Sequence, residues 1–175
     1  QPVACPDCGP RVRLSSPSGG AAAGDAGDVI GTAARALVDG RIVAVKGLGG
    51  YHLACDATSP AALRLLRERK KRDEKPFAVM VRTLDDARAL GLLDPAEERL
   101  LASIERPIVL VRQRPGGGLA PEVAPGNPLV GLILAYTPLH HLLLEAAGRA
   151  LVMTSGNRSE EPMAAGDPEA LERLS

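Results

Sequence analysis

Basic side chains gather where one helix is predicted to end. They are Arg69, Lys70, Lys71 and Arg72, followed closely by Lys75. Guanidinium and ammonium groups in such a position either compensate the helix dipole on a solvated face or bind phosphate oxygens through charge-assisted hydrogen bonds. Charge alone favours the first role. Phosphate binding becomes the better interpretation only if other ligand-binding groups lie close by in the fold.

A dense polar group, Thr154-Ser155-Gly156-Asn157-Arg158-Ser159, follows a strand that reads as buried. Ligands of open sheets bind at such strand ends. The hydroxyls, the amide and the backbone N–H groups suit phosphate and ribose oxygens, although a simple polar turn has the same composition. We favour a nucleotide site, with Thr154, Ser155, Asn157 and Ser159 as its binding residues.

The glycine-rich run Lys46-Gly47-Leu48-Gly49-Gly50-Tyr51-His52 follows another predicted strand. Glycine lets the backbone approach a ligand, and free N–H groups can hold an anion. The spacing matches neither a Walker A loop nor a dinucleotide fingerprint, so a plain turn between two strands is an equal alternative. Lys46, Gly49 and Tyr51 are candidate substrate contacts.

Two adjacent histidines lie in the first turn of a predicted helix that begins at Thr137-Pro138. Neighbouring residues point about 100° apart around a helix, so His140 and His141 cannot face the same site. One of them can face a site while the other faces solvent or packs, and His140 is the candidate substrate contact.

Cys5 and Cys8 have the spacing of a metal-binding pair. A closed structural zinc site needs four ligands, and Cys55 falls in a predicted strand. Three interpretations therefore remain: half of a zinc site completed by upstream cysteines, a redox pair, or inert thiols. We favour half of a zinc site, because Gly9-Pro10 continues a turn of the kind that surrounds such ligands.

Length and composition describe an ordinary globular domain. The chain has 175 residues, of which 45% are hydrophobic and 24% are charged, and its formal net charge is zero. This balance argues against disorder and gives no bulk reason to bind nucleic acid or membranes. The three aromatic residues (Tyr51, Phe77 and Tyr136) cannot form a platform for stacked bases. With no membrane-length apolar run, no signal-peptide core and an odd number of cysteines, we expect a cytoplasmic protein.

Helical and strand patterns alternate along the chain from residue 29 onward. This order predicts the α/β (mixed α+β) class, with one twisted mixed sheet flanked by helices. Residues 15–28 are small and predict a flexible linker. The predicted helices are 29–39, 59–72, 83–90, 94–103, 137–147 and 167 to the end of the chain, and the predicted strands are 41–45, 51–55, 76–81, 107–112, 129–134 and 150–154.

Four motifs together resemble the YrdC-like domain of the HypF carbamoyltransferases, which act in [NiFe]-hydrogenase maturation. The resemblance covers residues 29–175 and implies a three-layer fold. In one departure from the pattern, Asp73 rather than proline follows Arg72. The motifs are Lys70-x-Arg72 with Lys75-Pro76-Phe77-Ala78-Val79-Met80, then Arg106-Pro107-Ile108-Val109-Leu110, then Tyr136-Thr137-Pro138-Leu139-His140-His141, then Thr154-Ser155-Gly156-Asn157-x-Ser159.

The N-terminal segment adds to this resemblance. The run from Cys5 to Arg11 is similar to the last CxxC pair of the zinc region that precedes this domain in HypF. The implied organisation is the end of a zinc region over 1–14, a linker over 15–28 and a C-terminally truncated nucleotide-binding domain over 29–175. A structural Zn²⁺ would be completed by cysteines upstream, and acylphosphatase-like and transfer domains would flank the domain.

The resemblance also implies a reaction. The domain would use ATP and Mg²⁺ to activate carbamate, released from carbamoyl phosphate, as carbamoyl adenylate. The carbamoyl group would then pass to the C-terminal cysteine of HypE. Lys70 and Arg72 would be the catalytic residues, and the fragment alone is expected to be inactive.

Two other functions remain open. One is a threonylcarbamoyl-AMP synthase domain for tRNA modification, although glycines stand where that group usually carries hydroxyls in the first loop. The other is a non-catalytic module that binds double-stranded RNA, which the neutral charge disfavours.

Overall fold

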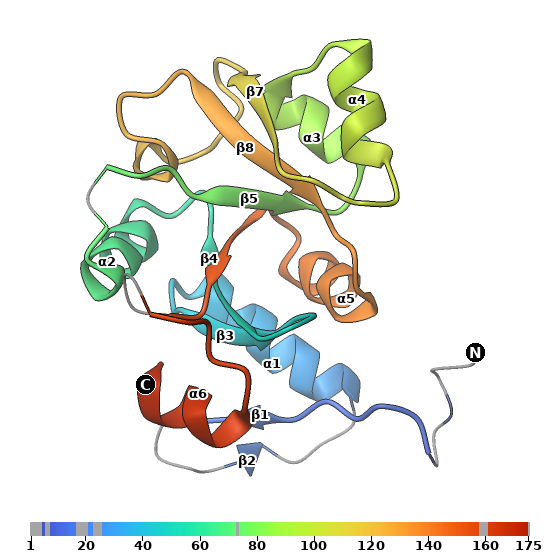
Figure 1. Ribbon diagram of the computed structural model, residues 1–175, viewed down its shortest axis with the longest axis vertical. Helices are drawn as coiled ribbons and strands as arrows, with labels where there is room; N and C mark the ends of the chain where they lie inside the picture. Colours follow the sequence, from blue (N-terminus) through green and yellow to red (C-terminus); the bar gives the residue numbers. More distant parts are fainter. Residues whose placement is uncertain are drawn as a thin grey trace.

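The computed structural model describes residues 5, 8–16, 21–22, 26–72, 74–157 and 161–174. Helices and strands alternate along most of this length (Figure 1). In chain order they are β1 (Leu14–Ser15), β2 (Ala21–Ala22), α1 (Ala26–Val38), β3 (Val43–Lys46), β4 (Tyr51–Asp56), α2 (Pro60–Lys70), β5 (Ala78–Val81), α3 (Leu84–Leu90), β6 (Gly91–Leu92), α4 (Pro95–Ala102), β7 (Val109–Gln113), the 3₁₀ helix η1 (Pro121–Val123), β8 (Leu129–Leu134), α5 (Pro138–Ala147), β9 (Leu151–Ser155) and α6 (Asp167–Arg173).

One mixed sheet organises the fold. Its strand order is β3-β4-β9-β5-β8-β7-β6, and a separate two-stranded sheet pairs β1 with β2. The β5–β8 pair is parallel, whereas the other neighbouring pairs described in the large sheet are antiparallel. Because β9 lies between β4 and β5, the late segment 151–155 is brought between two early strands. This crossover places the polar residues after β9 beside the end of α2.

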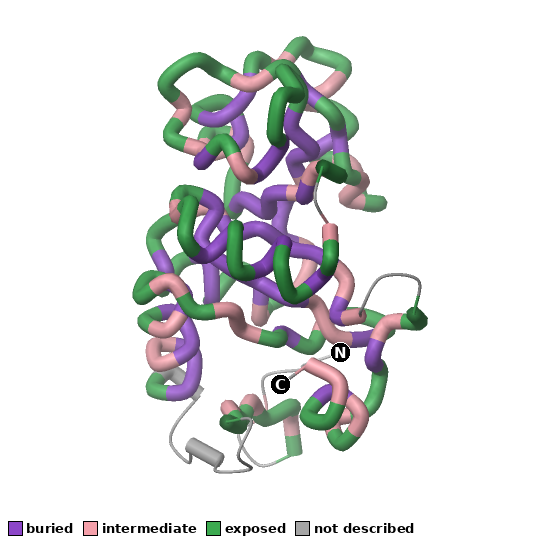
Figure 2. The backbone as a smooth tube through the Cα atoms, turned by 90° about the vertical axis from the view of Figure 1, so that its left-hand side faces the viewer, coloured by how far each residue is buried: buried purple, intermediate pink, exposed green. Residues whose placement is uncertain are grey.

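Helices cover both faces of the sheet, which gives the predicted three-layer α/β fold. One face packs against α2, α3 and α4 through a core that includes Leu66, Leu90 and Leu101. The other face packs against α1 and α5 through Leu37 and Leu143. Buried backbone runs through the middle of the molecule, and exposed turns lie around it (Figure 2).

Local sequence signals explain where several helices begin. The Ser59 hydroxyl accepts a hydrogen bond from the Ala62 amide, and proline follows at the first helical position. Capping boxes start α3 at Thr83 and α4 at Asp94. Within the described ranges, no helix is both long and apolar enough to cross a bilayer.

The structure corrects several predicted boundaries. Helix α1 begins at Ala26, inside the predicted linker 15–28. Strands β1 and β2 pair with each other, and β2 also falls within that linker. Helix α2 ends at Lys70 instead of continuing to Arg72, because Lys71 adopts a left-handed conformation with φ of 48°. Helix α6 ends at Arg173. The two-residue strand β6 and the helix η1 were not predicted, since such short elements carry no periodicity.

Candidate functional site

Lys70 is buried at the end of α2 and reaches the end of β9. Its Nζ atom donates hydrogen bonds to the carbonyl oxygens of Ser155 (2.6 Å) and Asn157 (3.0 Å), and to Oδ1 of Asn157 (3.0 Å). The Ser155 hydroxyl donates to the same Oδ1 atom at 2.7 Å. An ammonium group has three donors. Lys70 therefore uses its full hydrogen-bonding capacity to hold the segment that follows β9.

Arg72 lies just beyond the helix end and is half-buried against the same strand. Its Nη1 donates to the Thr154 hydroxyl (3.4 Å), its Nε donates to the Lys75 carbonyl (3.1 Å), and its Nη2 donates to the Pro76 carbonyl. The guanidinium carbon also lies 4.8 Å from the centre of the Phe77 ring. A guanidinium has five N–H donors, so Arg72 retains donors for a ligand.

Arg67 holds the turn that carries Arg72. It is 8% exposed, and its guanidinium donates to the carbonyl oxygens of Arg72 (2.9 Å), Lys75 (3.3 Å) and two residues of η1. Its guanidinium carbon lies 4.6 Å from the centre of the Phe77 ring. A planar fork can satisfy several carbonyls at once, which Lys cannot do in the same geometry. Through these hydrogen bonds, Arg67 fixes the backbone conformation around Arg72.

Lys70 (buried) and Arg72 (half-buried) at one strand end each have a pKa lowered by burial and by a neighbouring positive charge. Burial, with a smaller contribution from the nearby Arg72 charge, lowers the pKa of Lys70 to about 8. Burial also lowers the pKa of Arg72, and the Arg67 charge adds to this shift. A negatively charged ligand would relieve this repulsion. The electrostatics thus favour an anion at this strand end.

The candidate substrate contacts Lys46 and Tyr51 meet the start of α6. The Asp167 carboxylate accepts from Lys46 Nζ (2.6 Å) and from the Tyr51 hydroxyl (2.8 Å), and it also pairs with Arg13. These hydrogen bonds, led by the one from Lys46, lower the pKa of Asp167 to about 2. Burial and the bond to Asp167 raise the pKa of Tyr51 to about 12. Gly49 lies in the adjoining turn with φ of +82°.

His140 is fully buried, whereas His141 is exposed. The centre of its ring lies 4.5 Å from that of Tyr136 and 6.4 Å from that of His52, edge-on in both cases. Burial, with smaller contributions from His52 and His141, lowers the pKa of His140 to about 4. His140 is therefore neutral at pH 7.

The structure brings five of the predicted nucleotide-site residues together: Lys70, Arg72, Thr154, Ser155 and Asn157. Ser159 lies outside the described residues. Lys70 and Arg72 contact the β9 end directly.

Sequence reasoning missed three residues near these groups. Arg67, His52 and Asp167 gave no signal of their own, because each acquires its partners only through the fold. Asp167 was recognised only as the start of a helix. A buried arginine, one turn of helix before Lys70, could have been suspected from the apolar residues at Leu63 and Leu66 on the same helix face.

The three interpretations of Cys5 and Cys8 given above still stand. Cys5 is half-buried, Cys8 is exposed and Cys55 is buried. Among the described residues, no cluster of three or more histidine, cysteine, aspartate or glutamate side chains could hold a metal ion. Two thiolates alone do not complete a structural zinc site. A zinc bound by Cys5 and Cys8 would need ligands from outside the described ranges.

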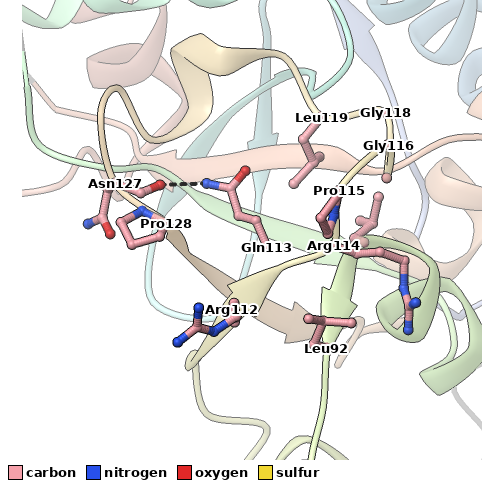
Figure 3. Close-up of a pocket in the computed structure, with 12 residues that line it drawn as sticks. Leu92, Arg112, Gln113, Arg114, Pro115, Gly116, Gly118, Leu119, Asn127 and Pro128 are labelled. Atoms are coloured by element: carbon pink, nitrogen blue, oxygen red, sulfur yellow. Dashed lines mark hydrogen bonds between the residues drawn. The ribbon is translucent and has the colours of Figure 1, made fainter.

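A cavity of about 800 Å³ lies away from Lys70 and Arg72. It is formed by the end of β7 and the glycine-rich loop that follows (Figure 3). Gln113 crosses it and donates to the Asn127 carbonyl at 2.8 Å. Arg112 and Arg114 give its wall a positive charge, but the residues singled out for chemistry are elsewhere.

Comparisons with known proteins agree with this fold. A family model described as telomere recombination (Sua5, YciO and YrdC) matches residues 35–175. The carbamoyltransferase HypF of Rhodobacter capsulatus is 54% identical over 175 residues, which is 100% of this chain and 23% of that protein. The chain therefore spans about a quarter of the length of this relative.

Solved structures give the same result. A crystal structure of full-length HypF, in the phosphate- and nucleotide-bound form, matches with a TM-score of 0.88 and 46% identity over 99% of this chain and 22% of that one. HypF from T. kodakarensis matches with a TM-score of 0.91 and 36% identity over 97% and 22% of the two chains. Since the family model covers most of the sequence and the folds agree, this chain belongs to the Sua5/YciO/YrdC family, with high similarity to the corresponding domain of HypF carbamoyltransferases.

Proposed function

We propose that this chain is the nucleotide-binding domain of a HypF-type carbamoyltransferase and that it activates carbamate with ATP. The observation that carries the proposal is the contact of Lys70 and Arg72 with the Thr154–Asn157 segment. Two cations, two hydroxyls and an amide meet at one strand end, where burial disfavours the cationic forms and an anion would stabilise them. The names of the similar proteins, and the nucleotide bound in one of them, support the same assignment.

The chemistry is a nucleotidyl transfer. A carbamate oxygen attacks the α-phosphorus of ATP, the bond from that phosphorus to the bridging oxygen breaks, and pyrophosphate leaves with the electron pair. Carbamoyl adenylate is the product. The protein forms no covalent bond, so its contribution is to position the reactants and stabilise negative charge.

Arg72 and Lys70 have different roles in this reaction. Arg72 has unused donors and is half-buried, so it contacts the phosphates directly. Lys70 is 5% exposed and fully hydrogen-bonded, so it acts by holding Ser155 and Asn157 in place and by contributing positive charge. Mg²⁺, when bound, would neutralise phosphate oxygens, and the Thr154, Ser155 and Asn157 oxygens are hard ligands compatible with it.

The rest of the pathway belongs to the longer protein. Carbamoyl phosphate would supply the carbamate through an acylphosphatase-like domain, and a transfer domain would pass the carbamoyl group to the C-terminal cysteine of HypE. Lys46, Gly49, Tyr51 and His140 remain the proposed substrate contacts of this domain. We place the reaction in the cytoplasm.

This proposal can be tested by measuring carbamoyl-phosphate-dependent ATP–pyrophosphate exchange in the full-length protein. One charge-assisted phosphate contact is worth roughly 1.5–3 kcal/mol, so Arg72→Ala should reduce exchange about tenfold or more. Arg69→Ala is the matched control, because Arg69 is exposed on the same helix. Unchanged exchange in Arg72→Ala would refute the assignment. Exchange that requires L-threonine instead would identify a threonylcarbamoyl-AMP synthase.

A further inference from the structure

Two histidines, His140 (buried) and His52 (half-buried), carry buried ring nitrogens that have no hydrogen-bond partner among the described residues. In His140 both Nδ1 and Nε2 are unpartnered, and in His52 Nδ1 is unpartnered. His140 is 0% exposed. A buried polar atom without a partner costs roughly 1–3 kcal/mol, so three such atoms in one place require a physical reason.

The two rings lie close together. Their centres are 6.4 Å apart with an interplanar angle of 83°, and the Tyr136 ring also packs against His140. The turn between β3 and β4 approaches His52 closely: a Cβ atom at Gly47 would lie 2.7 Å from Nδ1 of His52. Glycine is thus required at this position for the turn to approach the imidazole so closely.

This pair adjoins the strand end that carries the nucleotide site. His52 on β4 is directly opposite Ser155 on β9. Directly opposite residues of antiparallel strands project from the same face, with Cβ atoms about 5 Å apart. Ser155 in turn donates to Asn157, which accepts from Lys70. Polar groups therefore continue from Lys70 through Ser155 to His52 and His140.

The histidines offer a defined hydrogen-bonding pattern. Burial lowers the pKa of both rings, which keeps them neutral at pH 7. A neutral imidazole presents one N–H donor and one acceptor nitrogen. A small planar group that carries both an amine donor and an oxygen acceptor would satisfy such a pair. A methyl group in place of the amine would leave an acceptor nitrogen unpartnered.

We infer that His52 and His140 are specificity-determining residues that bind the amine and carbonyl of the carbamoyl group, while the Lys70 and Arg72 end binds the phosphate. The inference rests on the proposed function, since it assigns the acyl end of the same substrate.

The chain contains three histidines, and exposed His141 is an internal reference. Ring ¹⁵N resonances are followed by NMR in this chain during titration with three probes. They are 5′-O-(N-carbamoylsulfamoyl)adenosine, a stable analogue of carbamoyl adenylate, its N-acetylsulfamoyl counterpart with a methyl group in place of the amine, and AMP. We expect the carbamoyl probe to shift the resonances of His52 and His140 but not those of His141, and AMP to leave all three unchanged.

Affinity gives the second readout. The carbamoyl probe should bind about tenfold more tightly than the acetyl probe, the factor expected for one hydrogen bond to a buried acceptor. His140→Phe, checked for folding by circular dichroism, should abolish this preference and leave AMP binding unchanged.

Equal affinity for the two acyl probes, with no response of His52 or His140, would overturn the inference while AMP binding still supports the nucleotide site. Failure of AMP and both probes to bind would overturn the nucleotide site and the inference together. If His140→Phe does not fold, the unmodified chain still decides through the resonances and the ratio of probe affinities.

Discussion

Lys70 donates a 2.6 Å hydrogen bond to the Ser155 carbonyl, although 85 positions separate the two residues in the sequence. The contact joins the end of α2 to the end of β9. It exists because β9 inserts between β4 and β5 in the sheet. The same ammonium also binds Asn157, so one charge organises the polar segment after the strand.

The first prediction concerns the pH dependence of ATP binding. The pKa of Lys70 is lowered to about 8, so the ammonium loses its proton as pH rises through 8. Binding of a polyanion favours the charged form, and affinity for ATP should therefore fall by up to about eightfold between pH 7.5 and 9, as the protonated fraction falls. Lys70→Arg keeps its charge over this range and should flatten the profile in calorimetric titrations. A profile identical in both proteins would contradict the role of Lys70.

Stability at acidic pH should depend on His140. Its pKa is about 4 in the folded state, compared with about 6.5 when unfolded, so the unfolded state binds more protons between these values. The free energy of unfolding should fall as pH drops from 6.5 toward 4, by at most about 1.4 kcal/mol per pH unit from this group. Urea unfolding at pH 7 and pH 5 measures the effect. His140→Phe should weaken the dependence, and His141→Ala should retain it.

Substitution of His140 and substitution of His141 should reduce catalysis to different extents. In the full-length enzyme, His140→Ala should reduce exchange moderately, whereas His141→Ala should change it little, because His141 is exposed on the other side of α5. Both should matter less than Arg72→Ala. Should His141→Ala prove the most damaging of the three while still folded, the phosphate contact would be assigned to the wrong residues.

Arg67 should position Arg72 through the backbone. Arg67→Lys keeps one charge but loses the fork that binds four carbonyl oxygens, so it should lower the free energy of unfolding by about 2 kcal/mol and weaken ATP binding. Denaturant unfolding and calorimetry give the two values. Arg69→Lys, at an exposed position of α2, is the control and should change neither.

Zinc binding by this chain should be incomplete. Cys5 and Cys8 supply two ligands where a structural site needs four, so elemental analysis should find clearly less than one tightly held zinc per chain. One zinc shared by two chains would support a modified form of this prediction. One zinc in each monomer would contradict it.

Much of the fold could be predicted from local patterns. Ser59-Pro60, Asp94-Pro95 and Thr137-Pro138 start helices as their capping chemistry indicates. The end of α2 could not be predicted, because a left-handed residue at a helix end is usually glycine and here it is Lys71. The conformation of this turn also depends on the hydrogen bond from Arg67 to the Arg72 carbonyl, which forms only in the fold.

Which residues form the candidate site could be predicted from the sequence, but their arrangement in space could not. The order of the motifs indicated that Lys70, Arg72, Ser155 and Asn157 belong together. Their direct contact depends on β9 lying beside β5, which strand patterns do not reveal. His52 was missed for a related reason: its importance comes from facing Ser155 across the β4–β9 pair and His140 from α5.

The affinity of this chain for ATP, in the presence of Mg²⁺, tests the central claim most directly. Isothermal titration calorimetry should give measurable binding to the unmodified chain, at least tenfold weaker binding to Arg72→Ala, and unchanged binding to Arg69→Ala. Circular dichroism confirms that each variant is folded. Equal affinity in the unmodified chain and in folded Arg72→Ala would contradict the claim that the α2 and β9 ends form the phosphate site.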